Sequence, residues 1–131
     1  MELEVHLHSQ LADMRPILEV PGVKFVNLQI GEVANEIDET AAATGVSIHV
    51  FEDLDIRNDV EDVIALMATL DVIISARCWV VSTAGFLGTK GYCYTRHPNF
   101  LMFGQDFSPW APQTEVYYKQ SYRDSWEAPM S

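Results

Sequence analysis

Residues 58–75, NDVEDVIALMATLDVIIS, decide the fold class of this chain. The first part repeats apolar residues at helical spacing, namely Val60, Val63, Ile64 and Met67. Asn58 followed three residues later by Glu61 is typical of a capping-box helix start. Residues 71–75 are mostly apolar, which is typical of a strand that helices cover on both faces. The stretch therefore predicts a helix that leads into a buried strand.

Strand patterns recur on both sides of this stretch, at residues 24–29, 46–51 and 92–94. Helices are expected between them. One follows Gly31 and ends at Gly45, with an apolar stripe formed by Val33, Ile37 and Ala41. Another covers residues 79–87 and stops at Gly88. An earlier helix, capped by Asp13, tolerates Pro16 in its first turn and ends before residues 21–22.

Strands that alternate with helices through short loops indicate an α/β, Rossmann-like domain with a mainly parallel sheet between two helical layers. The whole chain, residues 1–131, is expected to form one such domain. The strand interiors should be mostly buried: Phe25, Val26, Leu28, Ile48, Val50, Val72, Ile73 and Ile74. Ligands of parallel α/β sheets bind beyond the carboxyl ends of the strands, so the loops there are the candidate site.

The composition excludes several classes of function. Lys and Arg total 8 against 19 Asp and Glu, so the formal net charge is -11 and nucleic-acid binding is disfavoured. No apolar run reaches the ~20 residues of a membrane span, and the N-terminal residues lack the features of a signal peptide. We therefore expect a cytoplasmic protein without membrane partners. Cys78 and Cys93 lie in apolar stretches and are expected to be free thiols.

The loop after the central strand is the strongest candidate for ligand binding. It contains Ser75, Arg77, Cys78 and Trp79, and the helix that follows contains Ser82. Helix N-termini bind phosphate through free amides, and the Arg77 guanidinium would add a cationic contact. The alternative is an ordinary crossover with a solvated arginine. No glycine-rich dinucleotide motif or P-loop is present in the sequence.

Other chemistry has little support. His97 follows a strand and is a candidate acid or base, or else simply a turn residue before Pro98. The acidic residues 52–59 resemble a calcium loop, but Arg57 occupies a ligand position and the glycine and closing glutamate are missing. His6 and His8 share a strand face without a third ligand. No catalytic nucleophile, metal or cofactor is expected.

Whole segments of the chain resemble the C-terminal, nucleotide-sugar-binding half of GT-B glycosyltransferase-like proteins. The resemblance is to bacterial proteins in which this half follows tetratricopeptide repeats. The matching segments span nearly the whole chain: residues 16–18, 21–29, 55–75, 84–88 and 108–112, and a strand with Tyr-Tyr-Lys-Gln at residues 117–120 before Trp126. The resemblance implies a Rossmann-like half of a GT-B fold that binds a nucleotide-sugar donor.

The departures from that family concern the donor site. The resemblance implies an acidic residue and a threonine, then a histidine, near the donor phosphates or ribose. Arg77, Cys78 and Ser82 occupy those positions here, so the donor site is expected to be rebuilt or lost. The family's opening strand and its acceptor domain have no counterpart in the sequence. Holding both substrates in attack geometry is worth ~7–11 kcal/mol of the barrier, so half a cleft is not expected to catalyse transfer alone.

Two hypotheses follow. In the first, the chain is a nucleotide-diphosphate-sugar-binding half, with Gln29 and Gly31 near the base and the loop from Ser75 to Trp79 at the phosphates. In the second, it is a non-enzymatic interaction domain that binds a partner or forms a homodimer. The second assigns a partner surface to Trp79 and to aromatic residues near the C-terminus, namely Tyr117, Tyr118, Tyr122 and Trp126.

Overall fold

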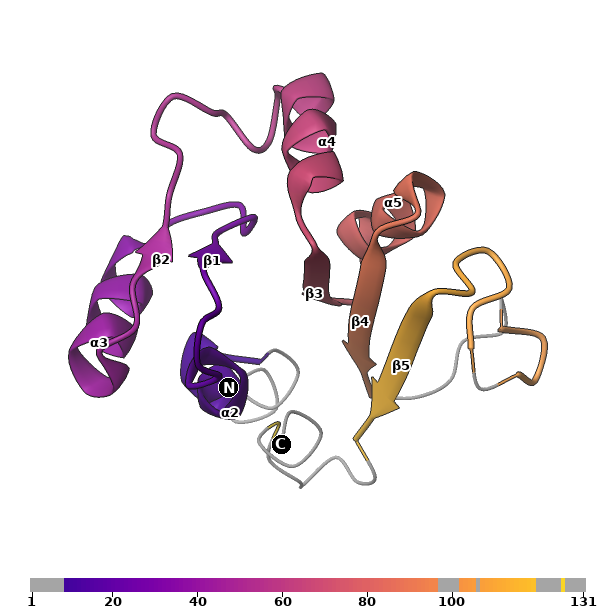
Figure 1. Ribbon diagram of the computed structural model, residues 1–131, viewed down its shortest axis with the longest axis horizontal. Helices are drawn as coiled ribbons and strands as arrows, with labels where there is room; N and C mark the ends of the chain where they lie inside the picture. Colours follow the sequence, from indigo (N-terminus) through magenta and orange to yellow (C-terminus); the bar gives the residue numbers. More distant parts are fainter. Residues whose placement is uncertain (1–8, 97–101, 106, 120–125, 127–131) are drawn as a thin grey trace, which may run out of the picture. The chain divides into compact units, whose positions relative to one another are not determined.

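The computed structural model describes residues 9–96, 102–105, 107–119 and 126. The chain is a mixed α/β protein with parallel strands, which confirms the α/β class of the expected fold (Figure 1). It divides into two compact units, residues 1–60 with 125–131 and residues 61–124. The described strands form two sheets, β1-β2 in the first unit and β3-β4-β5 in the second, and not the single sheet that we expected.

The first unit combines helices with a short strand pair. In chain order its elements are η1 (Leu11–Met14), α2 (Arg15–Leu18), β1 (Phe25–Val26), α3 (Ala34–Thr44) and β2 (Ile48–His49). The strands run parallel, with Phe25 level with Ile48. Both strands are shorter than the predicted ranges of 24–29 and 46–51. The other residues of these ranges lie in neither a helix nor a strand.

The helix ends in this unit follow local chemistry. Gly45 ends α3 in a left-handed conformation, φ 73°, as predicted. The expected cap at Asp13 is wrong, because Met14 is the N-cap of α2 and Asp13 lies in the preceding η1. Gln10 is the N-cap of η1, and the Asp13 carboxylate accepts a hydrogen bond from the Gln10 backbone N–H at 2.8 Å. Pro16 lies in the first turn of α2, where it costs no hydrogen bond.

The second unit contains the larger sheet. Its elements are α4 (Val60–Thr69), which begins at the boundary, then β3 (Val72–Ala76), α5 (Trp79–Leu87), β4 (Lys90–Thr95) and β5 (Thr114–Tyr118). All three strands are parallel in the order β3-β4-β5, and α5 packs against β3 and β4 (Figure 1). Gly88 ends α5 with φ 76°, as predicted.

The predicted capping box of α4 is wrong. The helix begins at Val60, two residues after Asn58. The Asn58 side-chain amide donates a hydrogen bond to Asp55 Oδ2 at 2.6 Å. The Asp55 carboxylate therefore stabilises the turn before the helix. The Asn58 side chain bonds within this turn and does not cap the helix.

The predicted burial of the strands is only partly right. Ile73 is 2% exposed, but Val72 is 42% exposed, and Val50 in the first unit is also exposed. The other predicted core residues are half-buried: Phe25, Val26, Leu28, Ile48 and Ile74. Ile73 is level with Gly91 and Thr114, both buried, whereas Val72 points to the opposite face of β3. The sheet thus shows one well-buried face, so its strands alternate more than their sequences suggested.

Two glycines allow close packing in this unit. A Cβ at Gly91 in β4 would lie 2.7 Å from the Thr114 hydroxyl oxygen in β5. A Cβ at Gly85 in α5 would lie 2.3 Å from the Ala111 Cβ. The segment before β5 therefore lies directly on the helix. None of the helices in the described part of the chain has the length and apolar character needed to span a bilayer.

Candidate functional site

The candidate site lies at the carboxyl edge of the β3-β4-β5 sheet. Because the strands are parallel, their carboxyl ends meet at this edge, and the chain passes from β3 into α5 there. Ser75 Oγ donates a hydrogen bond to the Ala76 carbonyl oxygen at 2.9 Å. Cys78 Sγ lies 3.2 Å from Ser75 Oγ. Because the Ser75 hydroxyl hydrogen is used in the bond to Ala76, the Cys78 thiol is the donor in this second contact. The contact joins both ends of the loop.

The N-terminus of α5 opens onto this edge. Cys78 is the N-cap, with extended backbone at φ -148° and ψ -172°, and no side chain among the described residues caps the helix. The amides of the first turn of a helix have no partner within the helix and favour anions. Ser82 Oγ donates a long hydrogen bond, 3.4 Å, to the Cys78 carbonyl oxygen. The Ser82 hydroxyl therefore serves its own helix.

Arg77 is the first residue after β3, and it is exposed. Its charge acts on Cys93 in the neighbouring strand. Burial raises the pKa of the Cys93 thiol to about 11, while the Arg77 charge opposes the rise and Cys78 adds to it. Arg77 and Cys78 thus lie close enough to Cys93, in the middle strand of the sheet, to influence the pKa of its thiol. Trp79 begins α5 and is partly exposed.

The predicted base-binding residues belong to the first unit. The Gln29 backbone N–H donates to Asn27 Oδ1 at 3.1 Å, and the Asn27 side-chain amide donates to the Gln29 carbonyl oxygen at 3.2 Å. Gly31 follows with φ 113°, which favours glycine. The structure thus places Ser75, Arg77, Cys78, Trp79 and Ser82 in the second unit, and Gln29 and Gly31 in the loop between β1 and α3 of the first. His97, His6 and His8 lie outside the described residues.

The acidic segment before α4 forms a turn. Asp55 Oδ1 accepts hydrogen bonds from the backbone N–H groups of Arg57 at 3.0 Å and Asn58 at 3.2 Å. These bonds, led by that from the Asn58 side chain, hold the pKa of the Asp55 carboxyl below its usual value. The carboxylate oxygens therefore organise the backbone of the turn.

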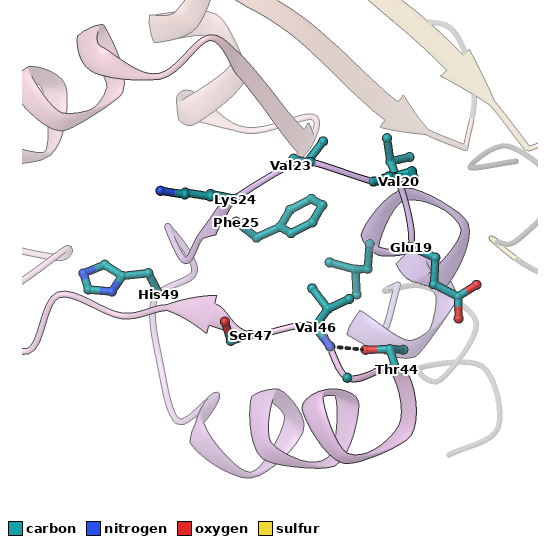
Figure 2. A pocket seen from close by; sticks show the side chains of 13 residues that line it. Glu19, Val20, Val23, Lys24, Phe25, Thr44, Val46, Ser47 and His49 are labelled. Carbon is teal, nitrogen blue, oxygen red and sulfur yellow. Dashed lines mark hydrogen bonds between the residues drawn. The ribbon is translucent and has the colours of Figure 1, made fainter.

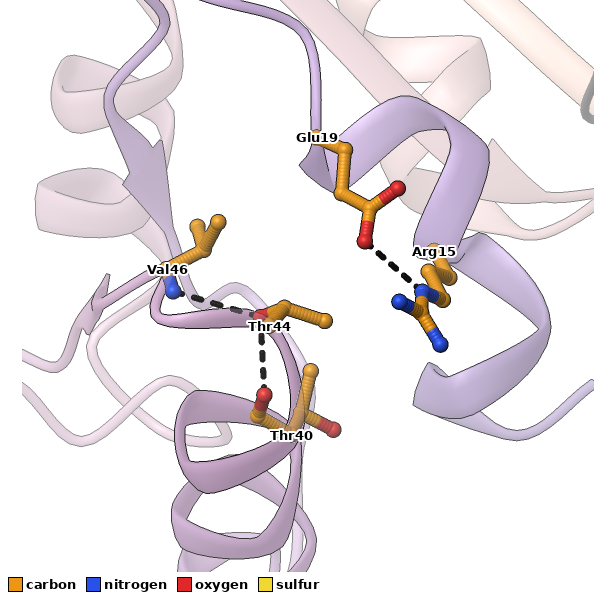
Figure 3. Close-up of polar contacts among 5 residues, drawn as sticks. All are labelled: Arg15, Glu19, Thr40, Thr44 and Val46. Carbon is orange, nitrogen blue, oxygen red and sulfur yellow. Dashed lines mark hydrogen bonds and ion pairs between the residues drawn. The ribbon is translucent and has the colours of Figure 1, made fainter.

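A shallow pocket of about 610 Å³ lies in the first unit (Figure 2). Its walls are the segment from Leu18 to Phe25 and the segment from Thr44 to Ser47, with His49. The Thr44 hydroxyl donates to the Thr40 carbonyl oxygen at 2.8 Å and accepts from the Val46 N–H at 3.2 Å, which fixes one wall (Figure 3).

Charged groups at this pocket are few. Near the opposite wall Arg15 pairs with Glu19 at 2.7 Å (Figure 3). Lys24 and His49 add polar groups to the lining (Figure 2). The pocket lies at the amino ends of β1 and β2, away from their carboxyl edge. Sequence patterns did not indicate it, because separate chain segments assemble it.

Sequence reasoning also missed two basic residues at the carboxyl edge of the larger sheet. Arg96 follows β4 and Lys119 follows β5 directly. Lys119 is 6% exposed, which is rare for a lysine. Sequence analysis expected the loop after residues 92–94 at the ligand edge but considered only His97 in it. It also placed Lys119 inside the strand with Tyr-Tyr-Lys-Gln, and not after it.

The chain is 34% identical over 115 residues to a protein named FlbA from Caulobacter vibrioides. The match covers 88% of this chain and 19% of FlbA, so the chain spans about a fifth of the length of the curated relative it matches. No protein-family model matches the sequence. No solved structure is significantly similar to it.

Proposed function

We propose that this chain is the nucleotide-diphosphate-sugar-binding part of a cytoplasmic, bacterial glycosyltransferase-like protein of the Rossmann-like, GT-B type. The donor diphosphate would bind at the carboxyl edge of the β3-β4-β5 sheet. One observation carries the proposal: the uncapped N-terminus of α5 lies at the carboxyl end of β3, with Arg77 beside it. Uncapped amides and a guanidinium together suit a phosphate anion.

The residues of the loop have distinct roles in this proposal. Amides at the start of α5 and the Arg77 guanidinium would bind the diphosphate. The contact between Ser75 and Cys78 would hold the loop in place, because it joins the end of β3 to the N-cap of α5. The chain would bind the donor without transferring the sugar, because transfer needs an acceptor held opposite the donor.

Thermal unfolding with and without nucleotide sugars tests the proposal. A ligand present at 100 times its dissociation constant adds ~2.7 kcal/mol to stability, a shift of several degrees for a domain of this size. We expect such a shift with at least one of the UDP-, GDP-, ADP- or dTDP-sugars at millimolar concentration. Arg57→Gln, which removes an exposed arginine of the first unit, should keep it. No shift with any of the four would refute the proposal.

A specific observation favours a second function, self-association. Phe86 is 79% exposed at the end of α5, and Phe103 and Trp110 are also largely exposed, with ring centroids 6.5 Å apart. Gly85 approaches Ala111 closely, and Phe86 and Trp110 are the sequence neighbours of these two residues. Both aromatic residues therefore lie next to the contact between Gly85 and Ala111. Trp126, which sequence analysis assigned to a partner surface, is buried and is unsuited to that role.

Oligomeric state tests this second function. Light scattering coupled to size exclusion should report a dimer at high concentration for the wild type. Trp110→Ser and Phe86→Ser should report a monomer, because exposed aromatic surface is what drives such association. A monomeric wild type at high concentration would exclude self-association.

A further inference from the structure

Each strand of the β3-β4-β5 sheet is followed directly by a basic residue. Arg77 follows β3, Arg96 follows β4 and Lys119 follows β5. These are three of only eight Lys and Arg residues in a chain of net charge -11. Three of the few cations of this acidic protein thus directly follow the strands of one sheet.

The strand register places Arg96 and Lys119 side by side. Thr95 is level with Tyr118, and the Lys119 N–H donates to the Thr95 carbonyl oxygen at 3.1 Å, so the ladder continues one residue beyond the strand ends. Arg96 is therefore level with Lys119 on the adjacent strand. Ala76 is level with Tyr94, so Arg77 is level with Thr95, one residue before Arg96, and approaches the edge from the other face of the sheet. Three neighbouring strands span about 10 Å, so long side chains from both faces can reach one small anion beyond this edge.

The three side chains differ in exposure. Arg77 is exposed, Arg96 is half-buried and Lys119 is buried. Lysine is rarely buried, and the burial of Lys119 places its charge in a region of lower dielectric than that around a solvated lysine. A cation in a region of low dielectric also attracts an approaching anion more strongly than a solvated one does.

We propose that Arg77, Arg96 and Lys119 form a cationic cluster that selects a diphosphate over a single phosphate. As an assignment to the donor's own diphosphate, this rests on the proposed function. A diphosphate carries more charge than a single phosphate and is long enough to contact cations on more than one strand. Arg77 reaches it from the start of α5, and Arg96 and Lys119 reach it from the ends of β4 and β5.

Calorimetric titration with inorganic pyrophosphate and inorganic phosphate tests the cluster without a nucleotide. The wild type should bind pyrophosphate at least tenfold more tightly than phosphate. Arg96→Gln and Lys119→Met should each weaken pyrophosphate binding about tenfold or more, the factor expected for a lost charge-assisted contact. Lys119→Arg keeps the charge and should retain most of the binding.

Lys90→Gln is the matched control, because Lys90 begins β4 and so lies at the opposite edge of the same sheet. It removes the same charge and should change pyrophosphate affinity less than twofold. Circular dichroism checks that each variant is folded, and Arg96→Gln decides the outcome if Lys119→Met does not fold. Equal weakening by Lys90→Gln would overturn the cluster, since a general field effect would then explain the binding.

The outcomes separate this inference from the proposed function. Absence of pyrophosphate binding by the wild type overturns the cluster, even if a nucleotide sugar raises the melting temperature. Pyrophosphate binding that is sensitive to Arg96 and Lys119, without any melting shift from nucleotide sugars, supports the cluster and overturns the nucleotide-sugar proposal. Equal affinity for phosphate and pyrophosphate contradicts the selectivity.

Discussion

At position 77 an arginine puts a positive charge next to the start of α5, where the proposed diphosphate would bind. A guanidinium there forms charge-assisted bonds with phosphate worth roughly 1.5–3 kcal/mol. The Ser82 hydroxyl, one turn into α5, instead donates to the Cys78 carbonyl oxygen of its own helix. The two residues should therefore contribute unequally to binding.

We expect Arg77→Ala to weaken nucleoside-diphosphate binding about tenfold or more, and Ser82→Ala to change it little. The reason is that Arg77 is exposed at the edge, whereas the Ser82 hydroxyl is used within the helix. Isothermal titration calorimetry with UDP or GDP measures both. Identical titrations for wild type and Arg77→Ala would mean that Arg77 is merely solvated.

The two thiols should differ in reactivity. Cys78 is exposed at the N-cap of α5, whereas Cys93 is buried and burial raises the pKa of its thiol to about 11. Because the thiolate is the reactive form, iodoacetamide at pH 8 should modify Cys78 in the folded protein and leave Cys93 unmodified. Peptide mass spectrometry reads out both sites. Prompt alkylation of Cys93 without denaturant would contradict its burial.

The Cys93 thiol also predicts a pH dependence of stability. Its folded pKa of about 11 is above the ordinary thiol value of 9.0, so between these pH values the folded state keeps a proton that the unfolded state has lost. Its contribution to stability is therefore fully present below pH 9 and is lost as the pH rises toward 11. Urea unfolding of wild type and Cys93→Ala across this range isolates the effect. A constant stability difference between the two proteins would contradict it.

At the scale of elements, two glycines of α5 serve different purposes. Gly85 meets Ala111, and a Cβ at that position would lie 3.1 Å even from the Ala111 Cα. Gly88 has open space around it but a φ of 76°, so its requirement is conformational. Gly85 is thus required for a close contact, and Gly88 for its left-handed backbone conformation.

We expect Gly88→Ala to lower stability by roughly 1 kcal/mol, the cost of a left-handed alanine. Gly85→Ala should cost roughly 1–3 kcal/mol, because a backbone atom must shift to admit the methyl group. Urea unfolding measures both values. The double variant Gly85→Ala with Ala111→Gly tests the contact, since it should recover part of the loss. Failure to recover any would show that the close approach is not what the glycine serves.

The sequence predicted helices better than strands, for a physical reason. Glycines in the left-handed conformation end α3 and α5 at the predicted residues, because that signal is local. The start of α4 was misplaced, since the Asn58 side chain bonds to Asp55 in the preceding turn and does not cap the helix. Strand length and burial depend on which chain segments pair and what covers them. Val72 and Ile73 are equally apolar in sequence but lie on opposite faces.

The part of the candidate site that is continuous in sequence could be predicted, whereas the residues that neighbouring strands bring to it could not. The loop from Ser75 to Trp79 is a continuous segment, and the structure places it at the end of β3 as expected. Arg96 and Lys119 come to the same edge only through the pairing of β4 with β5. Their register has no local signature, so the cationic edge emerges only once the sheet is known.

At the scale of the whole molecule, the net charge of -11 opposes contact between two copies of the chain. The aromatic surface formed by Phe86, Phe103 and Trp110 lies in a stretch with few charges, since α5 carries none. Apolar contact there must outweigh long-range repulsion. Salt shortens the Debye length from about 10 Å at 0.1 M to about 3 Å at 1 M, and so weakens only the repulsion.

Self-association should therefore tighten several-fold between 0.02 M and 0.5 M sodium chloride, as sedimentation velocity would measure, and Trp110→Ser should remain monomeric throughout. Diphosphate binding should respond in the opposite direction, because added salt screens the attraction between the anion and Arg77, Arg96 and Lys119. One salt series thus separates the two functions by the sign of their response. Association that weakens with salt would indicate a polar interface and would exclude the aromatic surface as its cause.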